Sequence, residues 1–507
     1  MFVRKLKNRS GSLSVQVIQK VRGKYKVVKT IGCATTQRKV EYLCNLAKQE
    51  IDKLESQPKL FETDQDETVD KVFASLQNAS IRTVGPEIIF GKIYDHIGFG
   101  AIAQKIFRHL VISRIAFPLS KLKTVDYLQR YQGTSLDIDA VYRFLDKLNS
   151  DLKDTVENIA FTHTKRVLNG NISVVFYDMT TLYFEASDED DLRKTGFSKD
   201  GKHQCPQIFI GLLVGLGGYA IGFAIFEGNT YEGHTLIPFL ETMSKKFNLE
   251  KPVVVADSGL LSKKNIEALE ENGYEYILGA RIRNESKPIK SQILSAKFID
   301  GTIHSFEKNE TQKIIVGYSN LRARKDQYNR DRGLKRLEKK IKSGKLTKSN
   351  INNRGYNKYL KLEGEISVDI DYDKFKNDTV WDGLKGYITN TKLTNKEVVV
   401  NYNNLWHIER AFRMSKTDLR IRPIYHRLKK RIEAHICISF TAYCIYKELE
   451  RVLRQEESTL SIKKAAELTH NMYKITYTLP DSKQTKSRLL QMDEQQLELY
   501  QIISENF

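Results

Sequence analysis

Val174-Val175-Phe176-Tyr177-Asp178 is an apolar run that ends on an aspartate. A second run of the same kind, Val253-Val254-Val255-Ala256-Asp257, follows further along the chain. Short, near-continuous apolar runs are typical of strands that are buried on both faces. We therefore predict two buried strands, each ending on a carboxylate that is costly to bury unless it is paired or bound to a metal.

The segments around these two runs alternate between strand and helix patterns. The strand from Ile172 to Met179 is followed by a predicted hairpin that turns at Gly217-Gly218. Further elements are predicted as helices over Thr235 to Phe247 and Ser262 to Glu271 and a strand over Tyr274 to Ile282. Three meandering strands, followed by strands reached through helical crossovers, indicate an α/β fold with a mixed sheet.

The composition indicates a polyanion as partner. The chain has 507 residues and a formal net charge of +20, and a large soluble protein with such an excess most often binds nucleic acid. An anionic membrane surface is disfavoured, because no amphipathic basic stretch with aromatic anchors stands out. The uncharged segment Ile208 to Phe226 holds five glycines and fits a hairpin better than a membrane span. Five scattered cysteines without a C-x-x-C pair predict neither disulfides nor a zinc site, and favour the cytoplasm.

Six segments follow from the changes in pattern along the chain. A basic strand and helix module is expected at the N-terminus, then a helical DNA-binding region, in which a helix pair across Gly133-Thr134-Ser135 is either a helix-turn-helix reader or a packing layer. A mixed α/β core in two parts is then interrupted by a basic insertion domain and followed by a C-terminal tail. The predicted segments are 1–60, 61–168, 169–283, 284–400, 401–455 and 456–507.

The insertion carries an unusual density of positive charge. Between Arg322 and Lys361 there are fifteen Lys or Arg residues and three acidic residues, a net charge of +12. A charge run is ordinarily a solvated helical face, but this density, interleaved with tyrosines, favours contact with nucleic-acid phosphates. The predicted DNA contacts of this segment are Arg322, Arg324, Lys335 and Arg336.

Glu409 is the candidate for a third functional carboxylate. It is followed at helical spacing by Arg413, Lys416 and Arg420, which we expect on one face of a helix. Two aspartates on adjacent strands repel one another, and a divalent cation is the common solution. Hard oxygen ligands suit Mg²⁺, for which Mn²⁺ substitutes. A metal held by Asp178, Asp257 and Glu409 beside cations is suited to phosphodiester hydrolysis or transfer.

Each of these residues also has an ordinary interpretation. An aspartate at a strand end is often a turn or cap residue, and Glu409 alone fits a salt bridge to Arg413. The prediction therefore depends on the three carboxylates occurring together in this order of strands and helices.

With these carboxylates in place, the sequence resembles the DDE transposases of bacterial insertion sequences. The resemblance covers roughly residues 170–283 and 400–445, with Asp178, Asp257 and Glu409 at the catalytic positions. One subgroup has a long insertion before the glutamate and a signature Tyr-x2-Arg-x3-Glu-x6-Lys. Here that signature is Tyr402, Leu405, Glu409 and Lys416, so a leucine replaces the arginine, for which Arg413 or Arg410 is the expected substitute. The predicted DNA contacts of this segment are Tyr402, Arg413, Lys416 and Arg420.

The resemblance implies a ribonuclease-H-like core and a transposase located in the bacterial cytoplasm. Such an enzyme binds the terminal inverted repeats of its element, cuts there, and joins the 3′ hydroxyl to target DNA, pairing two ends in a homodimer. Relatives form a hairpin at the element's end, often with help from a tryptophan in the insertion, for which Trp381 is the candidate. Two alternatives stay open: another ribonuclease-H-like nuclease, and a domesticated DNA-binding repressor that does not cut.

Overall fold

The computed structural model describes residues 1–9, 11–21, 23–55, 64–77, 80–198, 201–343, 346, 350–352, 355–363 and 367–507. It forms two compact units, one made of residues 1–78 and 476–486 and the other of residues 79–475 and 487–507. The predicted boundary between residues 60 and 61 lies outside the described residues.

The first unit is built on a three-stranded antiparallel sheet, in the order β1-β2-β3. Helix α1 covers one face of this sheet, where Val15, Val17 and Val40 are almost completely buried. The strands expected near the N-terminus and the helix that follows them are confirmed, and β1 is an additional strand. The elements are β1 (Phe2–Lys7), β2 (Leu13–Val21), β3 (Lys24–Ala34), α1 (Gln37–Glu55) and α2 (Asp64–Ala74).

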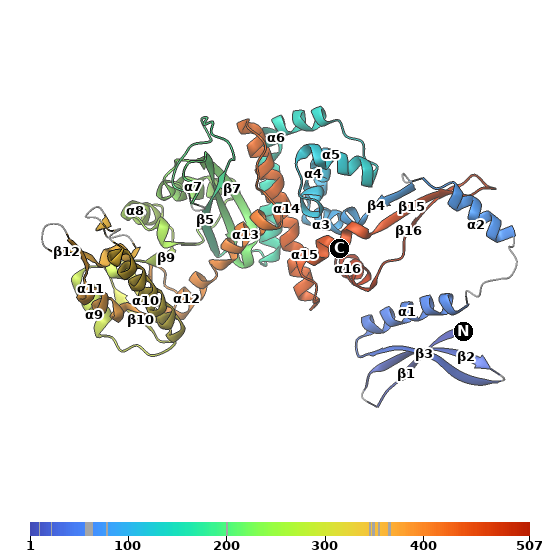
Figure 1. Cartoon of the computed structure of the whole chain (residues 1–507), viewed down its shortest axis with the longest axis horizontal. Helices are drawn as coiled ribbons and strands as arrows, with labels where there is room; N and C mark the ends of the chain where they lie inside the picture. Colours follow the sequence, from blue (N-terminus) through green and yellow to red (C-terminus); the bar gives the residue numbers. More distant parts are fainter. Residues whose placement is uncertain are drawn as a thin grey trace. The chain divides into compact units, whose positions relative to one another are not determined.

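The second unit is organised around an eight-stranded mixed sheet in the order β10-β11-β14-β9-β8-β5-β6-β7 (Figure 1). Strands β5, β6 and β7 form an antiparallel meander, and β8 and β9 run parallel to β5. This arrangement is the ribonuclease-H-like core, as predicted. The core strands are β5 (Val174–Tyr183), β6 (Gln207–Gly215), β7 (Ala220–Glu227), β8 (Val253–Ala256) and β9 (Tyr276–Ala280).

Apolar side chains are buried on both faces of the core strands, which explains their near-continuous apolar sequences. One face packs against α7 (Leu236–Phe247) and α8 (Lys263–Glu271). The other face packs against α6 (Ile138–Val167), α13 (Trp406–Thr417) and α14 (Lys429–Gln455). Between β6 and β7 the chain turns at Gly217 and Gly218, whose φ angles of 76° and 87° favour glycine. The predicted hairpin is therefore confirmed.

The insertion extends the catalytic sheet. Its strands β10, β11 and β14 continue the sheet beyond β9, and β14 pairs antiparallel with β9. The sequence predicted a separate basic domain and did not anticipate this continuity. The elements of the insertion are α9 (Lys287–Ser295), β10 (Ile303–Glu307), β11 (Lys313–Tyr318), α10 (Asn320–Lys342), β12 (Leu360–Glu363), β13 (Ser367–Ile370), α11 (Tyr372–Asn377), β14 (Leu384–Thr389) and α12 (Asn395–Asn403).

The helical region before the core is a packing layer. The 30-residue helix α6 buries Val141, Leu145 and Leu148 on the side that packs against α14. The second helix of the pair across Gly133 is therefore packed into the core. This supports the interpretation as a packing layer over a helix-turn-helix reader. The remaining elements are β4 (Ile81–Thr83), α3 (Lys92–Ile97), α4 (Lys105–Ala116) and α5 (Lys121–Tyr127).

The last fifty residues are more ordered than a tail. Leu499, Ile502 and Ile503 of α16 are almost completely buried in the same core as α14, so the expected tail is part of the second unit except for residues 476–486, which belong to the first unit. The elements are α15 (Ile462–Leu468), β15 (Tyr473–Thr478), β16 (Thr485–Leu489) and α16 (Glu494–Asn506). Among the helices of the described residues, we find none with the length and apolarity required to cross a membrane.

Candidate active site

Asp178 and Asp257 lie level with one another on adjacent strands. The parallel pairing of β5 and β8 ends with Tyr177 opposite Ala256, and the two aspartates are the next residues on their chains. Residues at the same level of neighbouring strands point to the same face, and neighbouring strands lie about 4.8 Å apart. The fold thus brings together two carboxylates that are far apart in the sequence.

One detail of the prediction for Asp178 is wrong. We expected this residue to end its strand, but β5 continues to Tyr183 and Asp178 pairs with Leu212 of β6. Only the partner strand β8 ends at this level, so Asp178 becomes half-buried while Asp257 is exposed. The Asp178 carboxylate accepts a hydrogen bond of 2.7 Å from the backbone N–H of Met179, and that of Asp257 accepts one from the N–H of Ser258.

Glu409 and Asp257 are linked through a lysine of the insertion. Glu409 is exposed on α13, and Lys385 belongs to β14. Burial is the largest cause that lowers the pKa of Lys385, and the charge of the Arg322 guanidinium lowers it further. The carboxylates of Asp257 and Glu409 raise it. Both carboxylates are therefore close enough to Lys385 to influence its pKa. A cation of the insertion thus belongs to the candidate site.

Tyr402 forms the floor beneath this lysine. The Nζ atom of Lys385 lies 4.6 Å from the centroid of the Tyr402 ring. A Cβ atom at Gly279 would come within 2.4 Å of the Tyr402 hydroxyl and 3.2 Å of Ser258, so a glycine is needed there. Tyr402 is only 8% exposed, and burial, followed by the charge of Asp257, raises the pKa of its hydroxyl. Its predicted contact with DNA stays a prediction.

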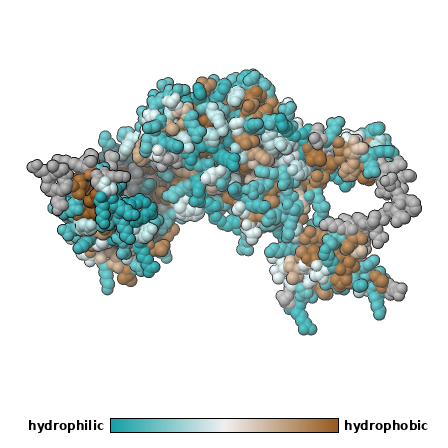
Figure 2. All heavy atoms as spheres, viewed as in Figure 1, coloured by the Kyte–Doolittle hydropathy of each residue, from teal (hydrophilic) through white to brown (hydrophobic). Residues whose placement is uncertain are grey.

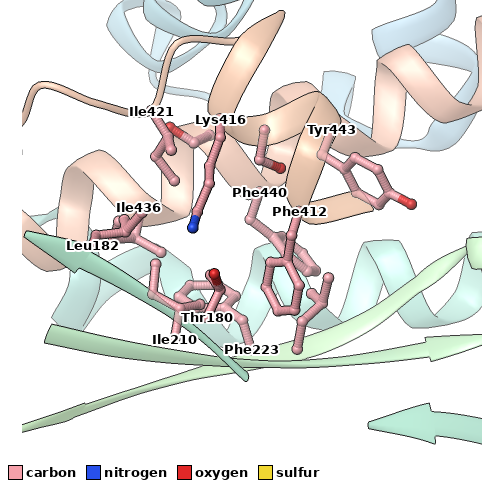
Figure 3. A pocket seen from close by; sticks show the side chains of 13 residues that line it. Thr180, Leu182, Ile210, Phe223, Phe412, Lys416, Ile421, Ile436, Phe440 and Tyr443 are labelled. Carbon is pink, nitrogen blue, oxygen red and sulfur yellow. The ribbon is translucent and has the colours of Figure 1, made fainter. Parts of the chain in front are cut away.

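Lys416 lies over the strand that carries Asp178. Its side chain lines a small apolar cavity with Thr180 and Phe412, and its amino group points toward Thr180 of β5 (Figure 3). Residues two apart in a strand share a face, so Lys416 covers the face to which Asp178 belongs. Lys416, the lysine of the signature, therefore lies on the same side of the sheet as the first carboxylate, Asp178.

The predicted row of cations on one helical face is wrong in its last member. Helix α13 ends at Thr417, and Arg420 lies beyond it with a φ of 44°. Arg413 remains on the helix and is exposed. Arg410, the other arginine suggested as a substitute for the missing signature arginine, forms an ion pair with Glu450 of α14. Whether Arg413 and Arg420 contact DNA stays a prediction.

A basic and aromatic cavity of about 610 Å³ lies beside the candidate site. Arg322 and Lys385 line it, together with several further cations and aromatic residues, namely Arg281, Arg283, Arg330, Lys358, Tyr356, Tyr359 and Trp381. Trp381 is half-buried and packs against the apolar cluster of the insertion, which supports its ordinary interpretation as a core aromatic. Asp326 and Asp382 also line the cavity and pair with Arg322 and Arg330, and Asp378 pairs with Arg283 and Lys358, so the net charge is positive but most of these cations are already paired.

The four basic residues predicted on the insertion do not form one surface. Helix α10 packs through Arg330, Gly333 and Leu337, and Arg322 lies at the edge of that packed side. The other three, Arg324, Lys335 and Arg336, are exposed on α10. The surface there is mainly hydrophilic (Figure 2). Only Arg322 is brought to the candidate site.

Two residues of the site were not anticipated from the sequence. Lys385 is one, and Arg281, which donates a hydrogen bond of 2.9 Å to the carbonyl of Ser258, is the other. Their only sequence signal is a charged residue in or beside an otherwise apolar strand, in Leu384-Lys385-Gly386 and Ala280-Arg281-Ile282. That signal is weak without knowledge that β9 and β14 are neighbours.

The donor chemistry of the three carboxylates fits a hard divalent cation. In the described part of the chain, no three or more His, Cys, Asp or Glu side chains are gathered closely enough to form a ready metal cluster. Asp178 and Asp257 are already level on adjacent strands, and Glu409 shares Lys385 with Asp257. The three carboxylates therefore suit a divalent cation, and their assembly around that cation is part of the proposal below.

Acidification is expected to destabilise the helix that carries Glu409. Burial, followed by the Lys447 charge, lowers the pKa of His407 to about 4, against about 6.5 in an unfolded chain. Between these values the unfolded chain takes up a proton that the folded chain does not, so stability falls as the pH falls from about 6.5 to about 4. His407→Gln should remove on the order of 2 kcal/mol of this fall.

Urea unfolding at a series of pH values measures this effect. His234→Gln is the control, because His234 is exposed and its substitution should leave the pH profile unchanged. An unchanged profile for His407→Gln would contradict the prediction.

The mixed sheet, with two carboxylates level on β5 and β8 and a third on a helix over the same face, defines a ribonuclease-H-like protein. The family model described as "Transposase DDE domain" matches residues 169–445, more than half of the chain, and the chain belongs to this family. It is a DDE transposase, an enzyme of the metal-dependent DNA nuclease and strand-transferase class.

Comparisons with solved structures give more distant similarities. A piggyBac transposase synaptic complex with hairpin DNA is 10% identical, with a TM-score of 0.38 and coverage of 76% of each chain. A Mos1 transposase paired-end complex with left transposon end is 12% identical, with a TM-score of 0.16, and covers 45% of this chain and 71% of that chain. A comparison with curated proteins gives no match.

Proposed function

We propose that this transposase binds the terminal inverted repeats of an insertion sequence, cuts the DNA at the element ends, and joins the freed 3′ hydroxyl to target DNA. The level placement of Asp178 and Asp257 on adjacent strands carries this proposal. Together with Glu409, these residues would hold Mg²⁺, with Mn²⁺ as a substitute. The chemistry expected there is two-metal phosphoryl transfer: when bound, one ion would activate the attacking oxygen and the other would stabilise the leaving oxygen of the phosphodiester.

The cations around the carboxylates would hold the DNA strand. Lys385 is the central one, because it lines the basic cavity and the charges of Asp257 and Glu409 act on its pKa. Its depressed pKa reflects burial without full compensation, and a DNA phosphate would supply the missing negative charge. Arg322 lines the same cavity and would supply a second cation to the strand. Charge-assisted hydrogen bonds of this kind orient a phosphate as well as attract it.

Recognition of the repeats would involve the first unit. The face of its sheet away from α1 carries a polar row across all three strands. Arg4 donates a hydrogen bond of 2.7 Å to the side chain of Gln16, which donates one of 3.4 Å to Thr30. Strands that present such side chains can lie in a DNA groove and contact base edges. Two copies of the chain would pair the two ends of the element.

Cleavage of a labelled duplex tests this function. The duplex carries the terminal repeat and its flank, and the reaction is run with Mg²⁺, Mn²⁺ or EDTA. The proposal expects nicking at the repeat boundary with either metal and none with EDTA. Binding without cleavage in either metal would favour the repressor, and cleavage without regard to the repeat would favour another nuclease of this fold.

Removing the outward charges of α10 should weaken DNA binding without changing its sequence preference. Arg324 and Lys335 are eleven residues apart, about three helical turns, and both are exposed. Contacts to phosphates carry no base information, so Arg324→Ala with Lys335→Ala should weaken binding to repeat and random duplexes equally. The slope of log affinity against log salt should decrease by about 2.

Fluorescence anisotropy over a range of salt concentrations provides the measurement. Lys263→Ala with Lys264→Ala, two exposed lysines at the start of α8, is the matched control. An unchanged slope in the α10 variant would show that this face does not contact phosphates.

A further inference from the structure

A second basic cavity, of about 570 Å³, lies on the side of the second unit where α4, α5 and α6 meet the segment after α13. Arg114 at the end of α4 and Lys121 at the start of α5 line its wall. The segment Arg420 to His426 forms its other side. None of these residues is part of the carboxylate site described above.

Arg114 and Lys121 are buried cations without an acidic partner. Their exposed fractions are 5% and 4%, and in the described residues no carboxylate pairs with either one. Among the described residues, the Arg114 guanidinium donates only a long hydrogen bond of 3.5 Å, to the carbonyl of Arg420, and its Nε atom has no partner there. Burial without a counter-charge is strongly unfavourable for two neighbouring cations.

The charges nearby do not compensate this pair. Burial, followed by the Arg114 charge, lowers the pKa of Lys121. Asp146 is a neighbouring carboxylate, and it is held by two hydrogen bonds of 2.6 and 2.9 Å from Arg431. Further cations, Lys123, Arg420 and Arg422, also line the cavity. The cavity thus has positive walls and room for an anion.

The cavity is continuous in sequence and space with the catalytic elements. Arg420 to His426 directly follows α13, which carries Glu409. The Arg422 guanidinium lies 5.0 Å from the centroid of the Tyr183 ring at the end of β5. Five residues of strand separate Tyr183 from Asp178, a distance of ~17 Å. A DNA strand that passes over the carboxylates would reach this cavity within a few nucleotides.

We propose that this cavity is a phosphate-binding subsite, in which Arg114 and Lys121 hold a backbone phosphate of the DNA strand that leads to the catalytic carboxylates. The proposal rests on the proposed function for the identity of the strand, but the anion site itself does not depend on catalysis. A bound phosphate neutralises the two buried cations, so the fold should be more stable when the site is filled. The subsite would fix the position of the strand relative to the scissile bond.

Thermal unfolding of the full chain in inorganic phosphate, against chloride at equal ionic strength, tests the anion site. We expect phosphate to raise the unfolding temperature of the wild type. Lys121→Met removes one buried cation while keeping the packing, so it should raise the unfolding temperature without phosphate and abolish the phosphate-dependent rise. Lys147→Met, at an exposed position of α6, should behave as the wild type.

A structural role for Lys121 predicts the opposite result. In that case Lys121→Met lowers the unfolding temperature and leaves the response to phosphate unchanged, which would overturn the proposal. Because this measurement uses neither DNA nor metal, a protein that never cuts would still give the expected result. Failure of the subsite and failure of the proposed function are therefore distinguishable.

A second measurement identifies the source of the phosphate. Single methylphosphonate groups are placed along a duplex carrying the terminal repeat, and binding is measured without divalent metal. At one position the neutral linkage should weaken binding of the wild type about tenfold and leave that of Lys121→Met unchanged. If no position distinguishes the two proteins, the cavity binds a free anion and its assignment to DNA is overturned.

Discussion

Asp178→Ala, Asp257→Ala and Glu409→Ala are each expected to reduce cleavage at the repeat boundary by on the order of a thousandfold or more, while leaving binding to the repeat nearly intact. A phosphodiester can be cut only when the attacking and leaving oxygens are stabilised, and removing one metal ligand removes most of that stabilisation. Gel mobility shift and cleavage assays on the same labelled duplex separate the two properties.

Glu271→Ala is the matched control for these variants. Glu271 is an exposed carboxylate at the end of α8, so its substitution should alter neither binding nor cleavage. Variants of the three carboxylates that cut as well as the wild type would show that the active site lies elsewhere. Loss of binding together with cleavage would instead indicate that the substitutions disrupt the fold.

Glu157→Leu is expected to lower the free energy of unfolding of the second unit by about 3 kcal/mol. Glu157 is completely buried on α6. Its carboxylate accepts hydrogen bonds of 3.0 Å from the backbone N–H of Phe223 on β7 and 2.6 Å from Lys246 on α7. Strand β7 is the last strand of the sheet, so this N–H has no strand partner and depends on the glutamate.

Two further variants separate the contributions to this effect. Glu157→Gln keeps an oxygen for the Phe223 N–H and loses only the charge, so it should cost less than Glu157→Leu. Asp154→Leu removes the other partner of Lys246, but its side chain is 84% exposed, and exposed pairs contribute less than about 1 kcal/mol. Equal losses for Glu157→Leu and Asp154→Leu in urea unfolding would contradict the prediction.

The divalent metal and the pairing of two protomers on DNA remain parts of the proposed function. The carboxylates supply the chemistry for the first, and the charge of the chain supplies the attraction for the binding of DNA. Lys385 links the candidate metal site to the DNA-binding charge of the insertion. It belongs to the insertion, but its pKa responds to the charges of Asp257 and Glu409. The insertion is therefore a part of the candidate site as well as a basic surface.

The sequence by itself determined the central strands and identified the three candidate carboxylates. Val174 to Tyr177 and Val253 to Ala256 are apolar at every position, and only strands covered on both faces are buried in this way. The spacing of Glu409, Arg413 and Lys416 likewise determined a helix, because local periodicity reflects which side of an element is covered. These features depend on neighbours in the sequence, so they can be predicted from it.

Only the tertiary structure decided what lies beside these elements. The continuation of β5 past Asp178 depends on pairing with β6, whereas the parallel strand β8 stops at Ala256. Lys385 reaches the site because β14 pairs with β9, and Arg114 and Lys121 become buried cations because α4 and α5 pack against the segment after α13. Long-range pairing and burial are properties of the folded chain, and no local pattern encodes which distant residues will meet.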